Sequence, residues 1–246
     1  MRHFISNIVS AMFLKKSVRD KVRVMIRYPQ TRDYIRLVRR FAGNNKHIKI
    51  KTMVGYGSSN LIVILNDKHV FKFPLRDDGK EVSMREKRIV DAFYGISPIK
   101  IPLLKIIPYK NIYIRKYEFA RGTLLTDVSP DVVVKHKDYI AKQIAEFLYV
   151  IAKNDPVEIR DLKQNPQEKP GYLVGWNHGD IWQNFMLDEK NCNITFFIDW
   201  EAANFGSLKP ALASASYHWE KFKYRRLIVE VMSQYSELYF KENQGK

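Results

Sequence analysis

The sequence predicts an α+β protein of two unlike lobes, with an N-terminal antiparallel sheet and one helix followed by a mainly helical C-terminal lobe. Residues 47–74 and 101–125 are rich in alternating and β-branched residues, a pattern typical of strands. Helical spacing of apolar residues dominates afterwards, most clearly over 139–152. A chain of 246 residues is long enough for two lobes that share a cleft.

The composition excludes several classes of protein. With 46% hydrophobic and 13% aromatic residues the chain can bury a core, so it is neither fibrous nor largely disordered. The single cysteine, Cys192, cannot form an internal disulfide, and no Cys/His cluster has zinc-ligand spacing. No run of about 18 apolar residues predicts a membrane-spanning helix. These features favour a globular cytoplasmic protein.

The net charge of +16 comes mostly from the N-terminal segment. Residues 1–51 hold 14 Lys and Arg against two acids, whereas the rest of the chain holds 28 against 24. A basic excess of this kind is typical of proteins with phosphate-rich or anionic membrane partners. We expect three parts, listed in chain order: a basic helical segment over 1–45, an N-lobe over 46–119, and a C-lobe over 120–246.

Two amphipathic helices are predicted in the basic segment, one around Ile5–Met12 and one around Tyr34–Phe41. Thr31 or Asp33 is the expected N-cap of the second helix, and Gly43 marks its end. A basic helix with an apolar face can lie on an anionic membrane, so residues 1–41 are a candidate peripheral membrane anchor. The alternative is that these helices pack on the following domain. No nucleic-acid-reading motif accompanies the charge, so a nucleic-acid partner is not expected.

Three antiparallel strands are predicted over residues 47–74, with turns at 55–60 and at 66–67. The first turn contains glycines whose backbone amides can approach phosphate oxygens. Lys72 lies between apolar residues of the third strand and either faces solvent or points into a cleft. A helix follows over 81–93, with Met84, Ile89 and Phe93 expected on its apolar side, and two further strands over 101–125 close the sheet.

The polar residues of 177–201 carry the clearest chemical signal. Asp180 precedes Asn184 in a short turn, and Asp199 follows the apolar strand ITFFI, so these side chains flank a hairpin. Phosphoryl transfer needs one carboxylate to accept the proton of an attacking hydroxyl, and hard oxygen ligands to hold Mg²⁺ on nucleotide phosphates. Asp180, Asn184 and Asp199 supply groups of these kinds.

Five motifs in order resemble the aminoglycoside phosphotransferase and choline kinase-like group, a branch of the protein-kinase-like fold. They are GYGSSN at 55–60, Lys72 in VFKFP, Glu86 in MREK, HGDIWQN at 178–184 and IDWE at 198–201. The resemblance covers residues from about 50 to 206. It implies a two-lobed protein-kinase-like fold and an enzyme that uses ATP and Mg²⁺ to phosphorylate a hydroxyl group.

The resemblance also implies roles for individual residues. Asp180 would be the catalytic base, Asn184 and Asp199 the Mg²⁺ ligands, and His178 a scaffold residue. Lys72 would pair with the ATP phosphates and with Glu86. The residues expected to bind the nucleotide are Gly55, Gly57, Ser58, Ser59, Lys72, Glu86, Lys116, Tyr117 and Phe119. The group usually has the asparagine five residues after the aspartate, whereas Asn184 is four after Asp180. A shortened loop can move the amide away from the metal, which leaves a catalytically impaired pseudokinase as an alternative.

The class of acceptor is inferred from the charge of the chain and from analogy with the group that it resembles. A kinase for polycationic aminoglycosides needs an acidic cleft, and this chain has little acidic excess anywhere. The leading hypothesis is therefore an O-phosphotransferase for a sugar or glycan hydroxyl at the cytoplasmic membrane face, similar to small bacterial kinases of lipopolysaccharide or polysaccharide biosynthesis. A protein kinase and an aminoglycoside kinase remain alternatives.

Overall fold

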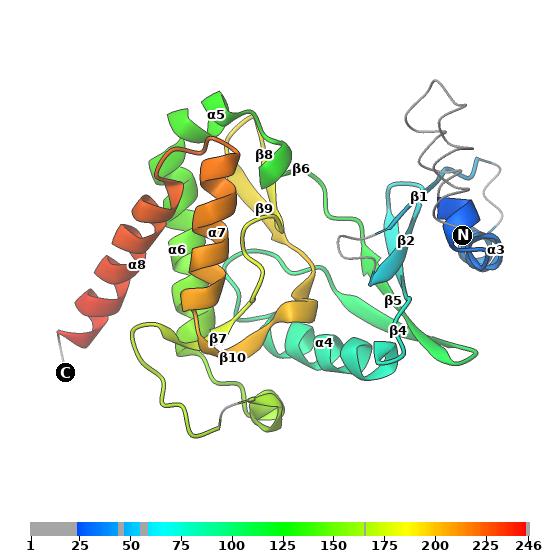
Figure 1. The fold of residues 1–246 in the computed structure, drawn as a ribbon, viewed down its shortest axis with the longest axis horizontal. Helices are drawn as coiled ribbons and strands as arrows, with labels where there is room; N and C mark the ends of the chain where they lie inside the picture. The colour runs from blue at the N-terminus through cyan, green and yellow to red at the C-terminus, as the bar shows by residue number, and fades with distance from the viewer. Residues whose placement is uncertain (1–23, 44–46, 55–58, 165, 245–246) are drawn as a thin grey trace. The chain divides into compact units, whose positions relative to one another are not determined.

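A computed structural model describes residues 24–43, 47–54, 59–164 and 166–244 (Figure 1). The chain divides into two compact units, Met1–Met84 with Leu104–Phe119 and Arg85–Leu103 with Ala120–Lys246. The lobe boundary predicted after residue 119 is also a boundary between these units. Residues 85–103, which the sequence placed in the first lobe, group instead with the second unit.

The first unit contains a five-stranded antiparallel sheet with the order β1-β2-β3-β5-β4. Its strands are β1 (Ile50–Val54), β2 (Asn60–Leu65), β3 (His69–Pro74), β4 (Leu104–Tyr109) and β5 (Ile112–Glu118). This confirms the three strands predicted over 47–74 and the two predicted over 101–125. Asn66 and Asp67 both have positive φ, at 55° and 49°, as the tight turn between β2 and β3 requires.

Strand register sorts the side chains of this sheet onto two faces. Phe71 on β3 lies opposite Val63 on β2 and Lys116 on β5, whereas Lys72 lies opposite Ile62 and Arg115. Successive residues of a strand point to opposite faces. Lys72 therefore shares a face with Arg115, and the apolar side chain of Phe71 belongs to the other face.

Helix α3 (Thr31–Arg40) packs on the face that carries Phe71. Val38 is fully buried there, and the ring of Tyr34 stacks on Phe73 with ring centroids 4.0 Å apart. The second amphipathic helix predicted from the sequence is thus confirmed, and its apolar stripe is covered by the protein's own sheet. The helix predicted around Ile5–Met12 lies outside the described residues.

The expected caps of α3 were wrong. The N-cap position is Gln30, and Thr31 is the first helical residue, because its buried hydroxyl donates back to the Tyr28 carbonyl at 2.5 Å. That bond continues the preceding turn, so neither Thr31 nor Asp33 caps the helix. Gly43 has φ +58° and lies two residues beyond the C-cap Phe41.

Helix α4 (Gly79–Phe93) agrees with the predicted helix, but its buried face differs from the prediction. Ile89 and Phe93 are fully buried as expected, whereas Met84 is 43% exposed. The buried face includes two polar residues instead, Ser83 and Glu86. The Ser83 hydroxyl donates to the Gly79 carbonyl within the helix, which offsets the cost of burying it. A pattern based on apolar residues alone does not detect this face.

The second unit is mainly helical and holds two small sheets. Helix α8 packs along α6 and α7 (Figure 1). Helix α6 confirms the predicted helix over 139–152. The helices are α5 (Pro130–Lys135), α6 (Lys137–Lys153), α7 (Lys209–Lys221) and α8 (Leu227–Asn243), with 3-10 turns η2 (Leu125–Asp127), η3 (Val157–Leu162) and η4 (Trp200–Ala202). The strands are β7 (Val174–Asn177) paired with β10 (Asn204–Ser207), and β6 (Thr123–Leu124), β8 (Phe185–Asp188) and β9 (Asn193–Phe197) in the order β6-β8-β9.

An aromatic core holds this unit together beside the β8–β9 hairpin. The buried rings of Phe147 and Phe185 contact Phe197 with centroids 4.5 and 4.1 Å from it, and Trp200 packs against the same group. Rings of this size dominate core burial. The core therefore contacts the segments that the sequence predicts to be catalytic, through His178. Across the helices that the structure describes, none combines the length and the apolar character needed to span a bilayer.

Candidate active site

The predicted catalytic loop connects β7 to β8. It begins after Asn177 with His178, which is fully buried and stacks on Phe197 with ring centroids 3.9 Å apart. Its Nε2 lies 3.0 Å from the carbonyl oxygen of Ile198. Because a carbonyl only accepts, Nε2 carries the proton of this bond. His178 thus ties the start of the loop to the segment before Asp199, as the scaffold role implied.

Gly179 brings the loop against η4. It has φ +78°, a conformation that favours glycine, and a Cβ built at this position would lie 2.3 Å from the carbonyl oxygen of Ala202. Its N–H donates to Asn177 Oδ1 at 3.0 Å. Any larger residue would push the loop away from η4, so glycine fixes the distance between these two segments.

The carboxylate of Asp180 is held by two amide side chains. Gln183 Nε2 donates to Asp180 Oδ2 at 2.9 Å, and Asn184 Nδ2 donates to the same oxygen at 3.3 Å and to the Asp180 carbonyl at 2.9 Å. These bonds fix the orientation of the carboxylate. Both side-chain bonds go to Oδ2, so they leave the other carboxylate oxygen, Oδ1, available to accept a proton.

The short spacing between Asp180 and Asn184 is accommodated by a tight turn over 181–183. Asn184 is 6% exposed and remains in contact with Asp180. Because its Nδ2 faces Asp180, its Oδ1 points to a different side and can serve as a ligand. Its backbone carbonyl accepts from the Ile198 N–H at 3.0 Å, so Asn184 is adjacent to the end of β9.

Asp199 follows β9 in the left-handed conformation, with φ 67° and ψ 61°. Aspartate tolerates this region better than most residues. The next residue, Trp200, is 1% exposed and donates from its indole to the Phe197 carbonyl at 3.1 Å. The buried indole anchors the chain on one side of Asp199, and the Ile198 bonds anchor it on the other.

The side chain of Arg85 on α4 binds the segment that follows Asp199. Its guanidinium donates to the Glu201 carbonyl at 3.4 Å and to the Ala203 carbonyl at 2.5 Å. Burial lowers the pKa of Arg85. Its ordinary pKa lies so far above neutrality that it stays charged. Arg85 therefore satisfies the carbonyl of the middle residue of η4 and that of its C-cap, in the turn that follows Asp199.

The donor set of Asn184 and Asp199 fits a magnesium ion. Amide and carboxylate oxygens are hard ligands, and Mg²⁺ in kinases takes only one or two carboxylates from the protein, with phosphates and waters completing the shell. In the described part of the chain no group of three or more His, Cys, Asp and Glu side chains is placed to hold a metal ion. A site at Asn184 and Asp199 thus suits an ion that arrives with nucleotide phosphates.

Lys72 and Tyr117, two of the residues predicted to bind nucleotide, lie close together in the first unit. Each is 7% exposed, and the Lys72 ammonium lies 5.4 Å from the centroid of the Tyr117 ring. Of the two orientations considered for Lys72, the burial of its side chain excludes the solvent-facing one. Ser59 lies just before β2 and its carbonyl accepts from the Leu75 N–H at 2.9 Å. Gly55, Gly57 and Ser58 lie outside the described residues.

The other predicted nucleotide ligands are placed differently. The Lys116 ammonium lies over the rings of Phe41 and Phe71, on the face that α3 covers, so it does not join Lys72. Phe119 follows β5, and its N–H donates to the Lys68 carbonyl at 2.9 Å. Glu86 is 1% exposed and belongs to the second unit, whereas Lys72 belongs to the first, so the predicted pair of these two residues stays a prediction.

Sequence reasoning missed two polar residues near Lys72 and one near Asp180. Arg115 is 1% exposed and donates to Asn60, which is 5% exposed. The sequence pattern of β5 could have revealed Arg115. Arg115 is two residues before Tyr117 on the same strand, so the two side chains lie on the same face of the sheet. Gln183, which holds Asp180, carried no signal beyond its place in the loop.

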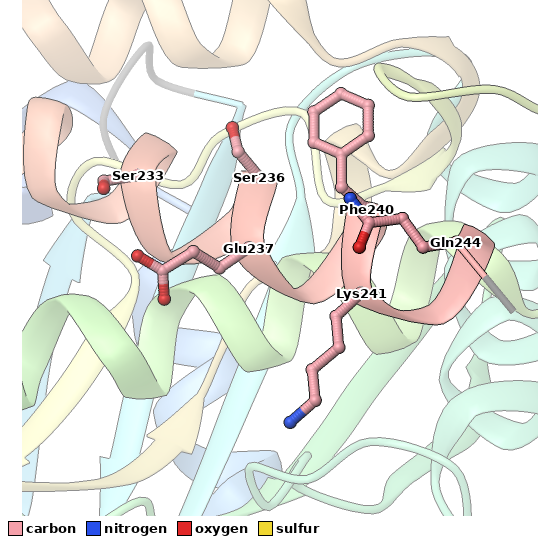
Figure 2. A pocket seen from close by; sticks show the side chains of 6 residues that line it. All are labelled: Ser233, Ser236, Glu237, Phe240, Lys241 and Gln244. Carbon is pink, nitrogen blue, oxygen red and sulfur yellow. The ribbon is translucent and has the colours of Figure 1, made fainter.

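A groove of about 660 Å³ runs along α8 and does not contain the predicted site (Figure 2). Its lining side chains all come from the last turns of that helix and its end: Ser233, Ser236, Glu237, Phe240, Lys241 and Gln244. With one carboxylate and one ammonium, this set lacks the combination of two carboxylates and an amide that Asp180, Asn184 and Asp199 supply.

The fold of the chain is similar to that of several solved phosphotransferase structures. APH(2")-IIia, solved as its GDP and kanamycin complex, is 16% identical, with 86% of this chain and 84% of that chain covered at a TM-score of 0.62. Macrolide 2'-phosphotransferase type I is 13% identical, covering 85% and 82% at 0.57. APH(3'')-Id from Streptomyces rimosus ATCC10970 is 13% identical, covering 83% and 91% at 0.58. The chain has the fold of these phosphotransferases, and the predicted protein-kinase-like fold class is confirmed. No protein-family model matches the sequence, and no curated protein has a matching sequence.

Proposed function

We propose that this chain, which shares its fold with aminoglycoside and macrolide phosphotransferases, is an ATP- and Mg²⁺-dependent kinase that phosphorylates a sugar or glycan hydroxyl. The observation that carries the proposal is the position of Asp180. Its carboxylate is held by Gln183 and Asn184 in a loop that is hydrogen-bonded to the residue before Asp199. A fixed carboxylate next to a second carboxylate and an amide oxygen is what phosphoryl transfer to a hydroxyl requires.

In the proposed mechanism Asp180 Oδ1 accepts the proton of the acceptor hydroxyl while the hydroxyl oxygen attacks the γ-phosphorus of ATP. The bond between the γ-phosphorus and the β,γ-bridging oxygen breaks, and ADP leaves with that oxygen. Lys72 holds nucleotide phosphates through its ammonium group. Asn184 and Asp199 would hold Mg²⁺, which when bound offsets the negative charge of the phosphates. Gln183 and Asn184 keep the Asp180 carboxylate oriented, so the base needs no rearrangement before transfer.

Charge supports a neutral or acidic acceptor. The second unit, which contains Asp180, holds 20 Lys and Arg against 19 Asp and Glu, so it has no acidic excess to attract a polycation. Complementary charge steers ligands and improves specificity. A sugar or an acidic sugar phosphate fits this balance better than an aminoglycoside does, even though APH(2")-IIia was solved with kanamycin.

A screen of nucleotides and acceptors tests the proposed function. We expect Mg·ATP or Mg·GTP to raise the midpoint of thermal unfolding, because a ligand that binds only the folded state stabilises it. We expect turnover with sugars or glycan fragments and none with kanamycin or choline. Turnover with kanamycin alone would replace the acceptor proposal, and phosphorylation of protein substrates would favour a protein kinase. Nucleotide binding without turnover on any acceptor would indicate an impaired enzyme.

We also propose that the arginines of α3 bring the enzyme to an anionic membrane at the cytoplasmic face. Arg32, Arg36, Arg39 and Arg40 are exposed, while the apolar stripe of the same helix is buried on the sheet. Contact would therefore be electrostatic, at about 1 kcal/mol per basic residue near the surface, without insertion of apolar side chains.

Charge reversal tests this location. Reversing Arg36 and Arg39 together, as Arg36→Glu with Arg39→Glu, should weaken binding to phosphatidylcholine vesicles containing phosphatidylglycerol by roughly tenfold or more. Turnover of a soluble acceptor should not change. The matched control reverses two exposed lysines of the second unit, Lys169→Glu with Lys190→Glu. Equal vesicle binding by the two variants would exclude α3 as the contact surface.

A further inference from the structure

Arg115 is a buried charge that the mechanism above does not use. It is 1% exposed, lies on β5, and is the direct cross-strand neighbour of Lys72 on β3. Its guanidinium donates from Nη2 to Asn60 Oδ1. Asn60 begins β2, which is on the far side of β3 from β5. The arginine side chain therefore crosses over β3 to reach the strand that follows the glycine-containing turn.

This bond fixes the orientation of the Asn60 amide. A guanidinium has only donors, so the Asn60 atom that faces Arg115 must be the oxygen. The Asn60 Nδ2 then faces Ser59 Oγ, at 3.1 Å. Because an amide NH₂ only donates, Ser59 Oγ is the acceptor of that bond. The hydroxyl proton of Ser59 must point toward a different acceptor.

The backbone around Ser59 is fixed as well. The Ser59 carbonyl accepts from the Leu75 N–H at 2.9 Å, and Asn60 lies opposite Pro74 at the end of the β2–β3 ladder. Pro74 and Lys72 are two residues apart on β3, so Asn60 is on the sheet face of Lys72 and Arg115. Ser59 is thus held by its main chain and by its side chain next to a face with two cationic groups.

We propose that Arg115 and Asn60 are positioning residues that orient the Ser59 hydroxyl as a donor to a nucleotide phosphate oxygen. The proposal rests on the proposed function, because the phosphate belongs to the nucleotide substrate. A hydroxyl that donates to a charged phosphate makes a charge-assisted hydrogen bond, which is stronger than a neutral one. Arg115 fixes the orientation of the Asn60 amide, and the Asn60 amide in turn fixes the direction of the Ser59 hydroxyl just before β2.

A double-mutant cycle on the full chain tests the proposal, with Mg·ADP titrated by calorimetry. Ser59→Ala and Arg115→Met should each raise the dissociation constant by roughly tenfold, the effect of losing one hydrogen bond to a charged group. The two changes together should weaken binding no more than about twofold beyond Ser59→Ala alone, because Arg115 acts through Ser59. Lys105→Met, which removes an exposed cation from β4 of the same sheet, is the matched control and should bind as wild type does.

Asn60→Asp is the second test and is designed to preserve stability. The introduced carboxylate can still accept from Arg115 but cannot donate to Ser59, so the hydroxyl turns toward the carboxylate and away from the phosphate. We expect about a tenfold loss of Mg·ADP affinity, which falls to a small effect in the Ser59→Ala background. If the affinity were lost instead through repulsion between the new carboxylate and the phosphate, the loss would be the same in the Ser59→Ala background.

The outcomes separate the positioning role from the proposed function. If the wild-type chain does not bind Mg·ADP, both are overturned. If the wild-type chain binds, and Arg115→Met and Asn60→Asp weaken binding by the same factor with and without the Ser59 hydroxyl, the positioning role alone is overturned. Non-additive losses in both cycles would establish it.

Discussion

Replacing Asp180 by asparagine should lower the rate of phosphate transfer by about 10²–10⁴-fold while Mg·ATP binding stays within about twofold of wild type. The amide oxygen can still accept from Gln183 and Asn184, so the loop keeps its hydrogen bonds. The amide cannot take a proton from the acceptor hydroxyl, so the base is lost. Single-turnover rates and calorimetry, each measured on both proteins, separate the two effects.

The matched control for this variant is Asp131→Asn, which removes an exposed carboxylate from α5 in the same unit. It should transfer phosphate at the wild-type rate. If the Asp180 variant keeps more than about a tenth of wild-type activity, Asp180 is not the general base, and the alignment of the HGDIWQN segment with a catalytic loop would have to be abandoned.

Asp199→Asn should reduce the Mg²⁺-dependent part of nucleotide affinity by roughly tenfold or more, because a charged metal ligand becomes neutral. Asparagine is the appropriate replacement here, since it tolerates the left-handed conformation of Asp199, whereas alanine would add backbone strain. Binding is measured with Mg·ADP and with ADP in excess chelator.

The comparison with Asp180→Asn makes this prediction specific. Affinity for metal-free ADP should be unchanged or slightly improved in the Asp199 variant, and only the increase caused by Mg²⁺ should be lost. Equal Mg·ADP affinities in the Asp180 and Asp199 variants would contradict the division of roles between the base and the metal ligand.

The sequence predicted the strands well because each had a local cause. Alternating β-branched residues and turn residues with positive φ, such as Asn66 and Asp67, specify a hairpin without help from distant parts of the chain. The sequence also located the loop between β7 and β8, because its residue types are few and their order is specific, and the catalytic role of this loop stays a prediction. The resemblance supplied the roles of these residues, and the structure shows how Gln183 and Asn184 hold one of them.

What could not be predicted depended on which surface an element meets. The spacing of Tyr34 and Val38 predicts an apolar face on α3, but an apolar stripe fits a membrane and a sheet equally well, and the sheet is what covers it. Met84 was assigned to the buried side of α4 because it is apolar. The face is set instead by position around the helix, which places Ser83 and Glu86 inside.

Arg115 was missed for a related reason. A charged residue in a strand reads as solvent-facing unless the register with its neighbours is known, and that register pairs it with Lys72. Once the strands are paired, the arginine faces Asn60, and the polar chain that ends at Ser59 follows from donor and acceptor chemistry.

Backbone groups take part in the contacts that join the loop around Asp180 to the segment around Asp199. The Ile198 carbonyl meets His178, the Ile198 amide meets Asn184, and Gly179 lies against the Ala202 carbonyl. Ionic strength screens attraction between charges but has little effect on backbone contacts of this kind. Added salt should therefore lower the affinity for a charged substrate and leave the structure around Asp180 and Asp199 unchanged.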